Sequence, residues 1–387
     1  MDFDLTEQQK LIRNSARQLM KQKVTPYLDA FPHGHIMTKA EITTVLGMLQ
    51  PLNFLGACLP EDEGGAGLDF LTYAVLMEEL DYRIWTTTYI ADAAVRYVAT
   101  YANSQQKARL MKRLLAGETI GCGANTEPDV GSAIPRGVTT KAVLDGDSYV
   151  INGTKAWISN GAVCDVCAVM ATEDAGKGRS AIHQYIVEKD VSPYTARRIP
   201  TIGDGPVADV AELVFEDCRV PKENKVAPVG SADVVKQWQI DMQFGRSMVA
   251  LSSVVIAQKA LDLAVQYAKE RKQFGKFIGE FQLIQAMIAE MKALTDASRL
   301  LVYRALDMAQ KGERSSAEAA VAKMFATEAA VKVTQMAMQI HGANGLATEY
   351  KVESLFRHAR MMTIPEGTTQ IQQLIIGKEL LGLSAMA

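Results

Sequence analysis

A single carboxylate near the end of the chain, Glu366, has the setting of a general base. It lies in the segment 364–370, and the spacing of Thr369 and Gln372 after it predicts a capping box at the start of a helix. Glu366 is therefore expected on a non-helical turn among apolar residues, where desolvation raises the pKa of a carboxyl and suits it to proton abstraction. The nearby helix N-terminus acts in the opposite direction, and the same pattern also fits a solvated glutamate favoured by the helix dipole.

Neither the cysteines nor the histidines have a spacing typical of a metal or redox site. The five cysteines are an odd number, which argues against a disulfide framework. Cys164 and Cys167 form a CxxC pattern, but they lie in an apolar stretch expected to be a strand, where residues three apart point to opposite faces. The five histidines lack the spacing of zinc ligands. No metal site is predicted.

Length and composition indicate a globular protein of several domains without a charge signature. The 387 residues leave room for two or three domains, at roughly 150 residues per domain. A net charge of -3 gives no footprint for nucleic acid or an anionic membrane. No apolar run approaches the ~18 residues that span a bilayer. The acidic N-terminus, with a capping box predicted at Thr6 and Gln9, does not resemble a signal or transit peptide, so a soluble cytoplasmic protein is expected.

The spacing of apolar residues changes twice along the chain, which predicts three domains. Helical periodicity with Gly/Pro loops extends to about residue 119, alternating β-branched runs separated by turn signals follow to about residue 230, and helical periodicity then returns. We expect an all-helical domain, a compact antiparallel β domain and a helical bundle. The apolar stripes of the last part fit a subunit interface, and they fit an ordinary core equally well.

Five motifs, taken together and in this order, resemble those of the acyl-CoA dehydrogenase family of flavoproteins. They are TEPDVGS at 126–132, WISNG at 157–161, RKQFG at 271–275, the Q-x-x-G-x-x-G segment at 339–345, and EGT at 366–368. The resemblance covers nearly the whole chain. It implies an α+β fold with an N-terminal α-helical domain at 1–119, a middle antiparallel β-barrel-like domain at 120–230 and a C-terminal four-helix bundle at 231–387.

The resemblance also implies a bound FAD. In the family, Trp157 packs on the flavin while neighbouring hydroxyls and backbone groups hydrogen-bond to it. Arg271 offers bidentate contact to pyrophosphate, although a basic residue at a helix C-terminus is also favoured by the helix dipole. The adenosine end is expected between two subunits, which implies a homo-oligomer, expected to be a tetramer. The residues assigned to the cofactor are Thr126, Ser132, Trp157, Ile158, Ser159, Arg271, Phe274, Gln282, Gln339, Gly342, Ala343, Thr368 and Gln370.

The implied reaction is α,β-dehydrogenation of an acyl-CoA thioester. Glu366 would remove the α-proton while the β-hydrogen leaves as hydride to the flavin, and two hydrogen bonds to the thioester carbonyl would stabilise the developing charge. Electron-transfer flavoprotein is the expected electron acceptor. Two alternatives from other classes are a flavin oxidase or monooxygenase of the same fold, and a non-catalytic binding or assembly subunit.

A second family position supports Glu366 as the base. Some members carry the glutamate just before an arginine in the helix that opens the C-terminal domain, and Gly245 occupies that place here, before Arg246. Arg246 is expected near the phosphopantetheine part of CoA, and Gln243 stands where the family commonly has aspartate. The chain also departs from the family at Asp129, Ala133 and Ala343.

The acyl group is expected to meet charged residues in the segment 82–95. Arg83 resembles the arginine that glutaryl-CoA dehydrogenases use on a distal carboxylate, and Asp92 resembles a second carboxylate near a cyclic acyl group. Either residue also fits an ordinary surface charge or ion pair. The substrate is thus expected to be a cyclic or dicarboxylic acyl-CoA. The predicted substrate-binding residues are Ser132, Arg246, Gln243, Gly367, Arg83, Tyr89 and Asp92.

Overall fold

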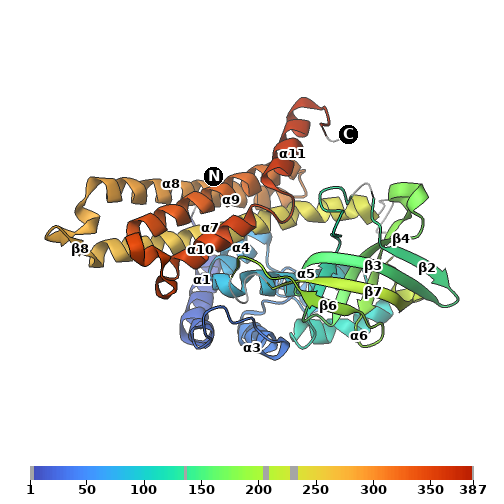
Figure 1. Cartoon of the computed structure of the whole chain (residues 1–387). Coiled ribbons are helices and arrows are strands. Elements are labelled where there is room, and N and C mark those ends of the chain that lie inside the picture. The colour runs from blue at the N-terminus through green and yellow to red at the C-terminus, as the bar shows by residue number, and fades with distance from the viewer. Residues whose placement is uncertain (1–3, 135–136, 204–208, 227–233, 386–387) are drawn as a thin grey trace.

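The computed structural model describes residues 4–134, 137–203, 209–226 and 234–385. Figure 1 shows a bundle of long helices from the C-terminal part at one end of the molecule and a β-sheet at the other, with the N-terminal helices packed along both. The predicted α+β fold with its three successive parts is confirmed. The boundary at residue 119 stays a prediction, and the boundary at residue 230 lies outside the described residues.

The N-terminal part is helical because each apolar stretch is introduced by a polar cap. The helices are α1 (Glu7–Leu19), α2 (Thr25–Asp29), α3 (Lys39–Leu49), α4 (Phe70–Glu78), α5 (Tyr82–Tyr101) and α6 (Ser104–Leu115). The capping box predicted at Thr6 and Gln9 is confirmed, and Asp81 caps α5 by accepting from the backbone N–H of Arg83.

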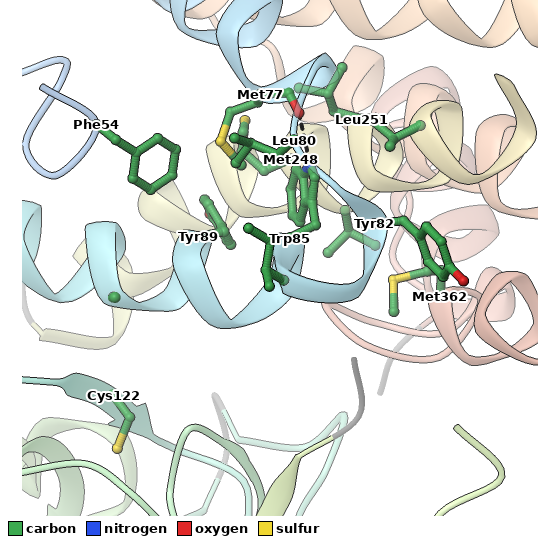
Figure 2. Close-up of a cluster of buried hydrophobic side chains, with 14 of the residues drawn as sticks. Phe54, Met77, Leu80, Tyr82, Trp85, Tyr89, Cys122, Met248, Leu251 and Met362 are labelled. Atoms are coloured by element: carbon green, nitrogen blue, oxygen red, sulfur yellow. Dashed lines mark hydrogen bonds between the residues drawn. The ribbon is translucent and has the colours of Figure 1, made fainter. Parts of the chain in front are cut away.

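Helix α5 lies at the centre of the molecule, where it joins the three parts. It packs against the sheet on one side and against the C-terminal helix α7 (Val234–Glu270) on the other. Figure 2 shows Trp85 and Tyr89 of α5 beside Met77 of α4 and Met248 of α7, and the indole N–H of Trp85 donates to the carbonyl of Met77 at 3.2 Å. Each such buried side chain contributes about 1.5 to 3 kcal/mol, so the position of α5 is firmly determined.

The middle part is one curled sheet. Its strands are β1 (Gly121–Ala124), β2 (Lys141–Asp145), β3 (Ser148–Ser159), β4 (Val166–Thr172), β5 (Ile182–Glu188), β6 (Thr195–Arg198) and β7 (Val210–Pro221). The strand order is β1-β4-β2-β3-β7-β6, with β5 also paired to β4. The pairs β2–β3, β3–β7, β4–β5 and β6–β7 are antiparallel, as expected. The sheet departs from that pattern where β1 pairs with β4 in parallel and β2 meets β4 in parallel at one residue pair. The long connection from β1 to β4 permits this parallel pairing.

The CxxC cysteines do not point to opposite faces as expected. Cys164 lies in the turn before β4, so strand alternation does not apply to it, and its Sγ is 3.2 Å from Sγ of Cys122. Cys167, on β4, has its Sγ 3.4 Å from the same atom. The three thiols are free and buried, and burial raises the pKa of the Cys167 thiol. Among the described residues no group of three or more His, Cys, Asp or Glu is placed to hold a metal ion.

The C-terminal part is a bundle of α7, α8 (Gln282–Gln310), α9 (Ser316–His341) and the shorter α10 (Val352–Met362), from which α11 (Thr369–Leu381) projects (Figure 1). Buried alanines such as Ala260, Ala264, Ala322 and Ala330 let the helix backbones approach closely. A hairpin of β8 (Lys272–Gln273) and β9 (Lys276–Phe277) joins α7 to α8. Residues Gln237–Glu270 are long and apolar enough to cross a membrane, but 72% of their most apolar window is buried inside the protein, as in a core helix.

Short helical turns complete the chain. They are η1 (Met20–Val24), η2 (Gln50–Leu52), η3 (Glu61–Glu63), η4 (Ala175–Ala181), η6 (Lys222–Asn224), η7 (Ile278–Glu280), η8 (Gly342–Leu346) and η9 (Thr348–Tyr350).

Candidate active site

Glu366 lies on the tight turn that joins α10 to α11. Its backbone φ is 57°, in the left-handed region that residues with a Cβ rarely adopt, and the φ of Gly367 is 90°. Holding a non-glycine residue there costs of the order of 1 to 3 kcal/mol. The surrounding structure must therefore fix this turn, and such strain is common where a side chain has to be presented at a functional site.

Two buried side chains hold the turn through its carbonyl groups. Nζ of Lys323, on α9, donates to the carbonyl oxygens of Thr363 at 2.9 Å and Gly367 at 2.8 Å. Nε2 of Gln372 donates to the carbonyl oxygens of Glu366 at 3.0 Å and Gly367 at 2.8 Å. Lys323 and Gln372 are both 0% exposed. The backbone that carries the Glu366 carboxylate is thus held from both sides.

The capping box predicted for Thr369 and Gln372 is wrong. The N-cap of α11 is Thr368, whose Oγ accepts from the backbone N–H of Ile371. Positive φ angles at two successive residues leave carbonyl groups of the turn without helical partners. Gln372 therefore donates to these carbonyls instead of accepting from an N–H at the cap.

The carboxylate of Glu366 is more basic than an exposed one. Burial raises its pKa, while the charges of Arg246 and Lys323 act to lower it, and the net direction is upward. Oε2 of Glu366 is buried and has no hydrogen-bond partner in the described parts of the chain. A buried basic carboxylate with an unengaged oxygen has the properties of a general base awaiting a proton.

Helix α7 faces this carboxylate at Gly245, about three turns after the helix begins. A Cβ added at Gly245 would lie 3.0 Å from Oε2 of Glu366 and 3.4 Å from its Cδ. The missing side chain therefore leaves the space that the Glu366 carboxylate occupies. Arg246 follows directly, burial lowers the pKa of its guanidinium, and its Nε has no hydrogen-bond partner in the described residues. The structure thus brings Gly245, Arg246, Gly367 and Glu366 together.

Gln243 and Ser132 are placed differently from these residues. Oε1 of Gln243 lies 3.4 Å from Oγ of Ser315, so its side chain faces the start of α9. Ser132 is exposed in the loop after β1. Their predicted contacts with CoA or FAD stay predictions.

Helix α5 places Tyr89 near Glu366, whereas Arg83 on the same helix pairs with other carboxylates. Tyr89 is buried, and burial raises the pKa of its phenol to about 12, with the charge of Arg96 opposing and that of Glu366 adding to the rise. Figure 2 shows Tyr89 next to Trp85, with their ring centroids 5.3 Å apart. The guanidinium of Arg83 instead pairs with Asp81 at 2.7 Å and Asp29 at 2.8 Å.

Asp92 is fully buried, and both of its oxygens are engaged within the protein. Oδ1 accepts from the backbone N–H of Gly56 at 2.7 Å. Oδ2 accepts from the hydroxyl of Tyr73 at 2.8 Å and from Nε of Arg96 at 3.0 Å. Its surroundings are those of a structural acceptor with a cationic partner.

On the β domain, a bulge in β3 exposes Trp157. The pairing of β3 with β7 shifts in register between Lys155 and Ile158, and Trp157 in this interval has a φ of 63°. Its indole is 58% exposed. The backbone N–H of Ala156 donates to the carbonyl of Thr126 at 2.9 Å, which brings the first two motifs together. Thr126, Trp157, Ile158 and Ser159 therefore lie in one region.

A buried ion pair fixes the loop of the first motif. Glu127 accepts from Nζ of Lys155 at 2.8 Å, and from Thr139 and from the backbone N–H of Thr140 at 2.8 Å. Although burial acts in the opposite direction, the charge of Lys155 and these hydrogen bonds lower the pKa of Glu127 to about 2. Asn160, beside the second motif, donates to the carbonyl of Thr87 at 3.0 Å and so ties this region to α5.

Most of the other predicted cofactor residues lie near β8, at the end of the bundle far from the sheet (Figure 1). Arg271, Phe274 and Gln282 follow the end of α7, and Phe274 is 93% exposed with a φ of 52°. The end of α9 is alongside, because the rings of Tyr267 and His341 stack at 4.2 Å. The residues concerned at that end of α9 are Gln339, Gly342 and Ala343. Thr368 and Gln370 lie instead at the start of α11, next to Glu366.

A cavity with a volume of about 1960 Å³ lies away from Glu366. It is between the N-terminal helices, α7 and α8, with Arg83, Arg299 and Tyr303 among its lining residues. We place the chemistry at Glu366 because a strained turn, a basic carboxylate and an unengaged oxygen coincide there, whereas the charged groups lining the cavity, such as Arg83 and Arg299, are ion-paired.

Lys323, Gln372 and Arg96 belong to the site but were not predicted from the sequence. The signal for Lys323 was present, since it lies on the α9 face that also carries Ala319, Ala322 and Ala326. A lysine within a stripe of small buried residues must find buried acceptors. Arg96 had a weaker signal, a cation one helical turn after Asp92.

Three successive parts of the chain match three domains of one protein family. Residues 6–118 match the description "Acyl-CoA dehydrogenase, N-terminal domain", residues 122–218 match the middle domain, and residues 235–381 match the C-terminal domain. The chain is 34% identical over 386 residues to a short-chain specific acyl-CoA dehydrogenase of Clostridium acetobutylicum, an alignment that covers 97% of this chain and 98% of the relative.

Two further similarities extend over equally long regions. A subunit of the caffeyl-CoA reductase-Etf complex of Acetobacterium woodii is 34% identical over 394 residues, covering 97% of this chain and 99% of the relative. The solved structure of butyryl-CoA dehydrogenase from Megasphaera elsdenii superimposes with a TM-score of 0.90 at 32% identity, covering 98% of this chain and 100% of that one.

Proposed function

Because the chain belongs to the acyl-CoA dehydrogenase family, whose three domains it matches in order, we propose that it transfers two hydrogens between an acyl-CoA thioester and FAD, with Glu366 as the base. The resemblance inferred from the five motifs is confirmed, and the chain is an oxidoreductase of this family. The observation that carries the proposal is the unengaged Oε2 of a buried carboxylate whose pKa is raised.

Glu366 takes the α-proton of the thioester in this proposal. An α-proton is weakly acidic, so a carboxylate made more basic by burial is better matched to it than an exposed one. The charges of Arg246 and Lys323 oppose the rise in pKa caused by burial and so favour the ionised form of the carboxylate. The fixed turn holds the acceptor oxygen in place, so that little reorganisation is needed when the proton moves.

The residues around Trp157 fit an isoalloxazine ring. Family members are flavoproteins, and an indole that is 58% exposed on a strained bulge provides a flat apolar surface for such a ring. Thr126, Ile158 and Ser159 would supply hydrogen bonds beside it. FAD bound there would supply an acceptor for the β-hydrogen as hydride.

A homo-oligomer, which we propose to be a tetramer, is supported by the distance between the two sets of cofactor residues. Trp157 lies on the sheet, whereas Arg271 and Phe274 lie by β8 at the other end of the molecule (Figure 1). One FAD reaches both sets only if a second copy of the chain contributes one of them. The exposure of Phe274, Leu283 and Leu346, at 93%, 80% and 74%, fits surfaces covered by another subunit.

Replacing Arg271 with alanine is expected to weaken FAD retention several-fold, because the guanidinium would no longer bind the pyrophosphate. The measurement is the ratio of flavin to protein absorbance after gel filtration. Lys259→Ala removes a charge from an exposed position elsewhere on α7 and serves as the control. Equal flavin content in the two variants would reject this role of Arg271.

Electron-transfer flavoprotein is the proposed redox partner. One relative is named as a subunit of a caffeyl-CoA reductase-Etf complex, which supports this proposal. A cytoplasmic location is supported by the five unpaired cysteines. The cyclic or dicarboxylic acyl group stays a prediction, and the pairing of Arg83 with Asp81 and Asp29 lends the dicarboxylic form no support.

The test of the proposed function is anaerobic bleaching of the bound flavin. A panel of straight, branched, cyclic and dicarboxylic acyl-CoA thioesters is added to the flavin-containing protein. Bleaching by one class supports acyl-CoA dehydrogenation. A protein that holds flavin but is bleached by none of them would overturn the proposal.

A further inference from the structure

Asp92 and Arg96, one turn apart on α5, form an ion pair next to the candidate base. Nε of Arg96 donates to Oδ2 of Asp92 at 3.0 Å, and the remaining bonds of this carboxylate go to Gly56 and Tyr73. Asp92 is fully buried, and both of its oxygens are engaged within the protein. Arg96 has capacity for a ligand, because its Nη2 is buried and has no hydrogen-bond partner in the described chain.

Two aromatic rings hold the guanidinium of Arg96 in place. Its central carbon lies 4.7 Å from the centroid of Phe244 and 5.7 Å from that of Tyr89. Burial raises the pKa of the Tyr89 phenol to about 12, although the charge of Arg96 acts to lower it. The hydroxyl therefore keeps its proton and can donate. A cationic N–H group and a phenol O–H group thus lie side by side.

This pair of donors is close to Glu366. Phe244 directly precedes Gly245, the residue that faces the Glu366 carboxylate, and the charge of Glu366 acts on Tyr89. An acyl chain that presents its α-carbon to Glu366 would therefore run between α5 and α7 toward Arg96. A plain alkyl end would leave the buried Nη2 donor unpaired, whereas an oxygen there would accept from it.

The charges around Arg96 disfavour an anionic ligand. Asp92 already balances the guanidinium, and the charge of Arg96 also acts on Asp241. A second carboxylate from the substrate would add an unbalanced negative charge at a buried place, which is costly. A neutral oxygen accepts from the same donors without this cost.

We propose that Arg96 and Tyr89 form a subsite for a neutral hydrogen-bond acceptor, a hydroxyl or carbonyl oxygen, at the end of the acyl group remote from the thioester. This inference rests on the proposed function, because it assumes that the thioester binds at Glu366. The substrate class is a hydroxyacyl-CoA or oxoacyl-CoA, in place of a dicarboxylic one. Arg96, and not Arg83, is then the arginine that selects the acyl group.

The experiment compares three thioesters of equal length that differ only at the far end: pentanoyl-CoA, 5-hydroxypentanoyl-CoA and glutaryl-CoA, with the set repeated one carbon longer. The readout is kcat/KM with a flavin-oxidising dye as acceptor. In at least one length, the hydroxyacyl-CoA is expected to exceed both others by ~10-fold, the factor given by about 1.4 kcal/mol. A preference for glutaryl-CoA or adipyl-CoA, or no preference in either length, would overturn the proposal.

Two variants of the subsite, and one of Arg83, test which side chains cause the preference for the hydroxyacyl-CoA. Asp92→Asn with Arg96→Gln removes both charges together, so no buried charge is left unpaired, and the ratio of hydroxyacyl to alkyl kcat/KM is expected to fall toward one. Tyr89→Phe removes a single donor and should reduce the ratio several-fold, which keeps the test valid if the double variant does not hold flavin. A fall of the ratio in Arg83→Gln instead would assign the selection to Arg83 and reject the subsite.

Failure of this inference is distinguishable from failure of the proposed function. If all three thioesters bleach the flavin equally, the dehydrogenase assignment holds and only the subsite is wrong. If none bleaches it, the proposed function itself fails.

Discussion

Replacing Glu366 with glutamine will lower acyl-CoA turnover by at least ~100-fold, the scale of a general-base contribution, while the protein keeps its fold and its flavin. Glutamine has nearly the same shape as glutamate but cannot accept the α-proton. The turn itself is held by Lys323 and Gln372 through backbone carbonyls, which the substitution does not touch. The measurements are kcat with an artificial electron acceptor, flavin content and the thermal midpoint.

The control for this substitution is Glu313→Gln, at an exposed position in the loop before α9. It should leave both kcat and flavin content at the level of the unmodified protein. Near-normal turnover in Glu366→Gln would remove Glu366 from the role of base. Loss of flavin in that variant would instead show that the carboxylate contributes to cofactor binding.

Replacing Lys323 with methionine is expected to have the second largest effect, because this side chain has two roles. It donates to two carbonyl oxygens of the Glu366 turn, and hydrogen bonds to charged groups contribute about 1.5 to 3 kcal/mol each. Its charge also acts to lower the pKa of Glu366. Methionine fills a similar volume but provides neither the donors nor the charge.

The pH dependence of the Lys323 variant separates these two roles. Glu366 acts as a base only when ionised, so kcat/KM rises with pH through its pKa. Burial lowers the pKa of Lys323 to about 8, with the charges of Glu366 and Glu328 opposing, so its charge is present at neutral pH. Without that charge the pKa of Glu366 rises further, the rising limb moves to higher pH, and kcat/KM at a pH on that limb falls by ~10-fold, the factor given by about 1.4 kcal/mol.

The matched control is Lys332→Met, an exposed lysine on the same helix. It should move neither the pH profile nor the thermal midpoint. A Lys323→Met protein with an unshifted rising limb would rule out the electrostatic role. A lowered thermal midpoint together with that unshifted limb would reduce Lys323 to a structural residue.

The elements of the fold could be predicted from local patterns, whereas contacts between distant segments could not. The helices and strands follow the spacing of apolar residues, and the box at Thr6 and Gln9 is as expected, because both signals depend on residues close in sequence. The parallel pairing of β1 with β4 depends instead on how a long connection returns to the sheet. The contacts of Cys122 with Cys164 and Cys167 were not predicted for the same reason.

The candidate site shows the same division. The motif at 366–368 indicated Glu366 and a turn, but the residues that hold the turn come from α9 and from the first turn of α11. Periodicity placed Lys323 on a helix and gave no sign that its ammonium group reaches two carbonyls of another segment. Arg83 was the arginine expected at the acyl group, but it pairs with Asp81 at the start of α5. The arginine that lies over the ring of Tyr89 is Arg96.

Because Gly245 lies against the Glu366 carboxylate, a glutamate from either of two segments of the chain could put its carboxylate at the same point in space. A side chain from α7 and one from the α10–α11 turn reach the same point, since a Cβ at position 245 would already touch the carboxylate. Two substitutions, one that vacates the turn and one that adds a glutamate on the helix, would therefore move the acceptor to a different segment while substrate and flavin keep their positions. The proton would then be approached from α7 instead of from the turn.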